Sequence, residues 1–92
     1  MSKESISKIY LILEKIEYIE QIVKNSGSIT QALEDSITTR PAILMHLTAI
    51  AEQFNKLKKA HDYEGVNLAI VEWIIRNGLP KFKNQCEILI KE

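Results

Sequence analysis

The stretch KESISKIYLILEKIEYIEQIVK, residues 3–24, decides the fold of this 92-residue chain. Its apolar residues recur at alternating steps of three and four, which places them on one face of a helix. After them comes Asn25-Ser26-Gly27, where Gly27 suits the left-handed position just past a helix end. The pattern predicts a helix from Lys3 to Lys24, about 33 Å long at 1.5 Å per residue. Its apolar stripe is Ile9, Ile12, Ile16, Ile19 and Val23.

The following residues predict a corner and a second long helix. Ser28-Ile29-Thr30-Gln31 has the form of a capping box, so a short helical piece is expected through Leu33. Residues 35–40 read as a polar connector, and Pro41 suits a first helical position because its missing donor would be unpaired there. We expect the helix that follows to pack antiparallel against the first. Its apolar stripe is Ile43, Leu47, Ile50, Phe54 and Leu57.

The last third of the chain predicts two further helices after a break at residues 58–65. Residues 68–76 are so apolar that this helix should be covered on most sides. Asn77-Gly78 is expected to end it, and Pro80 to start the last helix. The sequence therefore predicts one all-α domain over residues 1–92, an antiparallel bundle of about four helices. The inner face of the last helix would be Phe82, Cys86 and Leu89.

The composition limits the binding partners and the cellular location that can be expected. Twelve basic and twelve acidic side chains balance, so any contact with nucleic acid or phosphate must come from a local patch. Cys86 is the single cysteine, which excludes an internal disulfide and a cysteine-based zinc site, and fits a reducing, cytoplasmic location. We interpret it as a small buried apolar residue. No apolar run is long enough to cross a bilayer, so no membrane association is expected.

The chain has two histidines, and neither belongs to a recognisable metal or cofactor site. Two histidines and one cysteine on separate elements do not make a metal site, and no Gly-rich phosphate loop is present. His46 falls in the middle of the second long helix, on or near its polar side. Because nothing titratable pairs with it in the sequence, we interpret it as a solvated or interface histidine.

The segment KLKKAHDYEG, residues 56–65, holds the one candidate for chemistry. His61 follows Lys56 by five residues, and Tyr63 presents a hydroxyl two residues further on. An imidazole moves protons near neutral pH and a cation holds a scissile phosphate, so this set could cleave RNA. The simpler interpretation is a polar helix–helix corner in which the lysines are solvated and His61 or Tyr63 caps a backbone group. The spacing alone favours that interpretation.

The order of several short motifs resembles the HepT-like proteins of the HEPN superfamily, the small helical partners of minimal nucleotidyltransferases. The residues that carry the resemblance cover nearly the whole chain in the family's order. The first block comprises residues 6–9, 16–19, 33–38 and 40–44, and ends with LTAIAEQ, residues 47–53, which is similar to the family's L-x-x-I-G-E-A stretch. The second block comprises residues 61–66, Trp73 and Leu79-Pro80.

The resemblance implies a toxin of a bacterial or archaeal type II toxin–antitoxin pair. Members are homodimers with a metal-independent ribonuclease site built on an R-x(4)-H-x-Y motif. His61 takes the histidine position, which implies a role in cleaving RNA. Tyr63 takes the position of the tyrosine to which the partner nucleotidyltransferase, the antitoxin, adds AMP. No cofactor is implied.

The chain departs from the family pattern at the motif arginine. Lys56 occupies that position, and lysine lacks the planar fork that grips two phosphate oxygens. Members usually have a helical segment containing Arg-Asn before the histidine, whereas here residues 57–60 run straight into His61. Arg76-Asn77 lies after Trp73, where the family has no catalytic arginine. Two interpretations follow: a true deletion that leaves a bundle without nuclease activity, or a stretch of the natural chain that this sequence omits.

Because Lys56 occupies the position of the motif arginine, the sequence is also compatible with a function other than RNA cleavage. A catalytically inactive helical dimer could still bind a nucleotidyltransferase and serve as its substrate or regulator. A bundle without any partner is the plainest alternative.

Overall fold

The computed structural model describes residues 3–53 and 68–91. Within these ranges all regular secondary structure is helical, which confirms the predicted all-α class. No helix in the described ranges is long and apolar enough to span a membrane. The elements are α1 (Lys3–Ser26), α2 (Ile29–Glu34), α3 (Thr39–Glu52), α4 (Leu68–Trp73), the π-helical turn η1 (Ile74–Gly78) and α5 (Leu79–Lys91).

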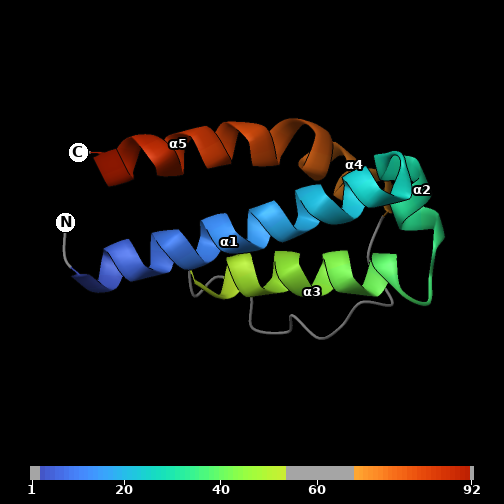
Figure 1. Ribbon diagram of the computed structural model, residues 1–92, viewed down its shortest axis with the longest axis horizontal. Coiled ribbons are helices and arrows are strands. Elements are labelled where there is room, and N and C mark those ends of the chain that lie inside the picture. The colour runs from blue at the N-terminus through green and yellow to red at the C-terminus, as the bar shows by residue number, and fades with distance from the viewer. Residues whose placement is uncertain (1–2, 54–67, 92) are drawn as a thin grey trace.

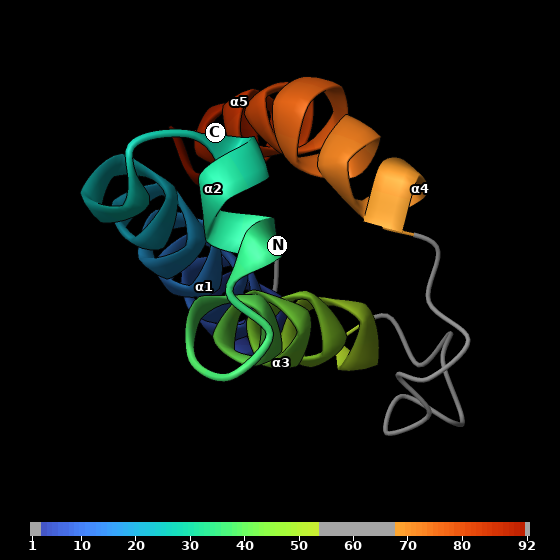
Figure 2. The same ribbon diagram turned by 90° about the vertical axis from the view of Figure 1, so that its right-hand side faces the viewer.

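The long helix α1 lies at the centre of the packing. In Figure 1 α1 leads toward α2, and α3 leads back along one side of α1. The last helix, α5, packs along another side of α1. Figure 2, which looks along the helices, shows α3 and α5 on separate sides of α1 and α4 at the edge of the molecule. The shared core therefore depends on α1.

The predicted stripe of α1 is the middle of that core. Ile12, Ile16 and Ile19 are buried, while Ile9 and Val23 are partly buried and pack against them. The second stripe is confirmed for its described members, because Ile43 and Ile50 are buried and Leu47 packs against the core. The other buried residues are Ala32, Leu33, Leu44, Val71, Ile75, Leu79 and Cys86.

The end of α1 has the predicted chemistry. Gly27 adopts a φ of 103°, a left-handed conformation in which its N–H donates to the carbonyl of Val23. Ser28 then caps α2, since its hydroxyl accepts a hydrogen bond from the Gln31 N–H at 3.1 Å. The helix runs to Ser26, two residues beyond the predicted end.

The corner between α2 and α3 is a dense hydrogen-bond network and more than a polar connector. One carboxylate oxygen of Asp35 accepts from the N–H groups of Ile37 and Thr38 at 3.0 and 2.9 Å, and the other accepts from the Thr38 hydroxyl. These bonds, the Thr38 hydroxyl first, hold the pKa of Asp35 below its ordinary value. Thr39 and Arg40 reach back to the end of α2, where they donate to the carbonyls of Ala32 and Leu33. Thr39 and Arg40 thus satisfy two carbonyl groups at the end of α2.

The prediction that Asn77-Gly78 ends the third helix is wrong. The backbone stays helical through η1 into α5, and the Leu79 N–H donates to the carbonyl of Ile74, five residues back. The physical reason is Pro80, which has no N–H to offer the carbonyl of Arg76 and whose ring crowds that carbonyl in a regular helix. Widening the preceding turn relieves this conflict without ending the helix. Pro80 does lie in the first turn of α5, as expected.

Candidate functional site

The predicted site residues Lys56, His61 and Tyr63 lie outside the described residues. The hypothesis that they form a ribonuclease site therefore stays a prediction from the sequence. The described residues present three other arrangements of side chains and one apolar groove, and each is built from its own elements.

The first arrangement joins α1 to α3 through aromatic side chains. The rings of Tyr18 and His46 lie 5.2 Å apart between centroids, tilted by 45°. Lys15, one turn before Tyr18, places its ammonium nitrogen 5.4 Å from the centre of the tyrosine ring, a distance typical of a cation–π contact. His46 thus has neighbours that no local sequence pattern could reveal, because they lie about 30 residues away on another helix.

The surroundings of His46 favour its neutral form. Partial burial and the positive charge of Lys15 both lower the pKa of the imidazole below 6.5. A neutral imidazole can accept a proton at neutral pH. Tyr18 is 45 % exposed, and no hydrogen bond fixes its hydroxyl to another described residue. The rings of Tyr18 and His46 meet between two helices, so they serve as a packing contact between α1 and α3.

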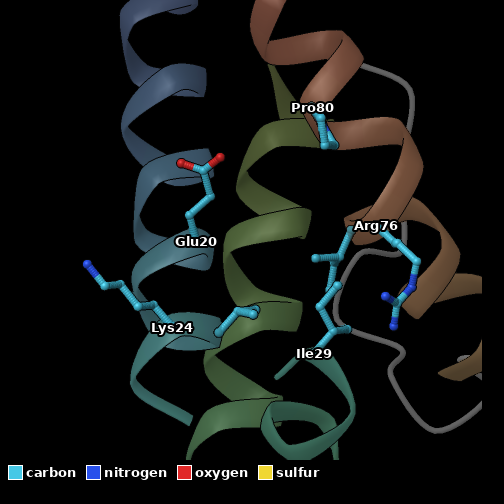
Figure 3. A pocket seen from close by; sticks show the side chains of 7 residues that line it. Glu20, Lys24, Ile29, Arg76 and Pro80 are labelled. Atoms are coloured by element: carbon cyan, nitrogen blue, oxygen red, sulfur yellow. The ribbon is translucent and has the colours of Figure 1, made fainter. Parts of the chain in front are cut away.

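The second arrangement is a shallow depression of about 330 Å³ between the end of α1 and the turn η1. Its surface is almost entirely apolar because the charged groups at its rim turn outward. Figure 3 shows Lys24 and Arg76 extending to opposite sides, away from one another. Glu20 is engaged elsewhere, since its carboxylate accepts from the Lys83 ammonium at 2.9 Å. Two cations at one rim therefore do not converge on a shared anion site.

An apolar groove of about 390 Å³ separates α3 from η1 and α5. One wall is formed by the end of α3 and the other by η1 and the start of α5. The lining residues are Leu47, Ile50, Ala51, Ile74, Gly78, Leu79 and Phe82.

The third arrangement surrounds the only tryptophan of the chain, at the junction of α4 and η1. Trp73 is 62 % exposed and Ile70 is also exposed, so the expectation that this helix is covered on most sides is wrong for that face. Arg76 pairs with Glu72 at 3.1 Å, and both side chains are open to solvent. Asn77 donates its side-chain N–H to the carbonyl of Trp73 at 3.2 Å. The junction therefore carries an exposed tryptophan and, three residues further on, an exposed arginine.

The remaining reactive groups of the described residues do not form a site. Cys86 is buried, as predicted, and burial raises the pKa of its thiol. Among residues 3–53 and 68–91, no three acidic, histidine or cysteine side chains gather as metal ligands would.

No family model, curated protein or solved structure matches this chain. A functional proposal therefore depends on the residues and on the geometry described above.

Proposed function

We propose that this protein is the HepT-like ribonuclease toxin of a type II toxin–antitoxin pair, an antiparallel helical bundle that acts as a homodimer in the cytoplasm. It cleaves RNA without a metal ion, and a minimal nucleotidyltransferase is its antitoxin. His61 moves the proton, Lys56 holds the scissile phosphate, and Tyr63 accepts AMP from the partner. The observation that carries the proposal is the ordered pair of motif blocks that ends in His61-Asp62-Tyr63.

Two structural findings support this proposal at a coarser level. The described chain is helical throughout its regular structure, as a HepT-like protein requires. Three residues of the first motif block also act together in the structure. Leu33, Asp35 and Arg40 all take part in the hydrogen bonds of the α2–α3 corner.

The chain offers a matched control for the catalytic claim, because it has one histidine inside the proposed motif and one outside. Purified protein should cleave single-stranded RNA in the presence of a metal chelator. His61→Ala should abolish cleavage, since the proton-transfer group is lost, whereas His46→Ala should retain it. A gel-based assay with labelled RNA measures both. Full activity in His61→Ala, or none in the parent protein, would remove the catalytic claim.

The lysine at the arginine position favours a second candidate, an inactive dimer that binds a nucleotidyltransferase. A lysine holds phosphate as a single point charge and cannot form the paired contacts of a guanidinium. This candidate predicts RNA that stays intact and a nucleotidyltransferase recovered with the tagged protein when neighbouring genes are co-expressed. The intact mass of native protein would show any AMP on Tyr63, as well as any extra residues before His61.

A further inference from the structure

We propose that Trp73 and Arg76 form a contact site for single-stranded RNA, in which the indole stacks on an unpaired base and the guanidinium binds a neighbouring phosphate. The proposal rests on the proposed function, because it names how the same protein would hold its RNA. It can nevertheless succeed or fail independently of cleavage.

Trp73 is unusually exposed for a tryptophan. A side chain with so large an apolar surface is usually buried, yet this one is 62 % exposed at the edge of the molecule where α4 lies. An indole presents a flat face on which any base can stack, whatever the sequence of the strand. The Asn77 amide, which donates to the carbonyl of Trp73, secures the turn that carries the indole.

A cation, Arg76, follows Trp73 within one turn. Figure 3 shows the Arg76 guanidinium pointing away from the apolar depression. Its ion pair with Glu72 spans 3.1 Å between two solvent-exposed groups, with 55 % and 37 % of the side chains exposed. Such pairs contribute little to stability, so a phosphate can replace the carboxylate. A guanidinium binds phosphate well because it offers several fixed donors.

The surroundings of Trp73 favour RNA over a protein partner. The neighbours of Trp73 along the helix are the exposed Ile70 and the charged pair Glu72 and Arg76, whereas a continuous apolar lining of the kind a protein-docking groove needs lies elsewhere, between α3 and α5. Since the chain has no net charge, a polyanion needs a local contact of this kind. Stacking supplies the part of the affinity that does not depend on charge.

Intrinsic fluorescence tests the stacking directly, because Trp73 is the only tryptophan. Titrating the full-length protein with a uridine oligonucleotide should quench the emission to saturation. In an anisotropy assay with labelled oligonucleotide, Trp73→Ala should bind about 5- to 100-fold more weakly. Trp73→Phe should recover part of that loss because a phenyl ring still stacks. Ile70→Ala, which removes a neighbouring exposed apolar group, serves as the matched control and should bind like the parent.

The charged pair gives a test that misfolding cannot imitate. Glu72→Gln should bind RNA more tightly, since it frees Arg76 and removes a negative charge from the path of the phosphates. Arg76→Gln should bind more weakly and lower the salt dependence of the affinity by about one phosphate contact.

Several results would overturn the proposal. These are absence of RNA binding, binding without quenching, and unchanged affinity in Trp73→Ala. Quenching that depends only on protein concentration would instead assign this face to a second copy of the chain. RNA binding that requires Trp73 but is not followed by cleavage would support this site and contradict the proposed ribonuclease.

Discussion

At the scale of single residues, the most informative contact is the one between Tyr18 and His46. Tyr18 lies in the first motif block and His46 in no motif, and their positions in the sequence give no reason to pair them. Packing of α3 on α1 brings the rings within 5.2 Å, and Lys15 adds a positive charge beside them. The sequence pattern predicts His46 on or near the polar side of its helix, which is compatible with its half-buried position. That pattern could not reveal that Tyr18 lies against the imidazole or that Lys15 lowers the pKa of His46.

The lowered pKa of His46 makes part of the stability depend on pH. The group binds its proton less readily in the folded protein than in the unfolded chain, whose pKa is near 6.5. Its contribution is therefore fully present above about pH 6.5 and is lost as the pH falls toward the folded pKa. Between about pH 7.5 and pH 5.5, the parent protein should lose more stability than His46→Gln.

Urea unfolding at the two pH values measures this difference. Lys15→Met, which removes the nearby cation, should bring the pH dependence closer to that of His46→Gln. An identical pH dependence in the parent and in His46→Gln would show that folding does not change the pKa of the histidine.

At the scale of the elements, the sequence predicts helix ends correctly where a side chain or a glycine caps the helix. It predicts a helix end wrongly at Asn77-Gly78, shortly before Pro80. Ser28 and Gly27 follow rules that operate within a few residues, so the sequence predicts them correctly. Asn77-Gly78 has the same composition as a helix end, but the helix continues because Ile75 and Leu79 on either side are buried and the turn before Pro80 widens to accommodate the proline. Burial keeps the helix intact here, and a local rule contains no information about burial.

Two glycines of similar appearance in the sequence should respond in opposite ways to alanine. At Gly27 a Cβ atom would meet the Gln31 side chain while the backbone is left-handed, so Gly27→Ala should destabilise the protein by about 1–2 kcal/mol. At Gly78 the nearest atom to a new Cβ is Ile74 Cγ2 at 3.8 Å, an ordinary contact. Gly78→Ala should therefore stabilise the protein by about 0.5–1 kcal/mol.

Thermal unfolding followed by circular dichroism compares the two variants with the parent. A loss of stability in Gly78→Ala would mean that η1 needs the freedom of glycine.

At the scale of the whole molecule, stability depends on a small core whose centre is α1. The sequence predicted most of this core, because the apolar stripe of a long helix marks its own buried face. It could not predict which side of α4 is open, since the exposed Trp73 and the buried Val71 lie two residues apart in an apolar run. The proposed catalytic residues remain a prediction because Lys56, His61 and Tyr63 are outside the described ranges.

Removing side-chain volume from the centre of the core should lower the free energy of unfolding substantially. Ile16 is fully buried, and Ile16→Ala should destabilise it by about 2–5 kcal/mol. That loss is a large share of the roughly 5–14 kcal/mol available to a domain of this size. Ile88→Ala is the matched control, because Ile88 is 51 % exposed and its truncation should change little. Chemical denaturation measures both, and equal effects would contradict the central position of α1.

The packing of α5 on α1 has a consequence for biosynthesis. The helix α1 is translated before α5, and in the folded protein one of its sides is covered by α3 and another by α5, including the ion pair of Glu20 with Lys83. The side that faces α5 stays open until α5 has been translated, because no other described element packs there. During that interval the nascent chain exposes apolar surface along α1, which makes it a substrate for chaperones and a target for proteases. The order of synthesis thus sets a period of vulnerability that ends only when the C-terminal helix docks.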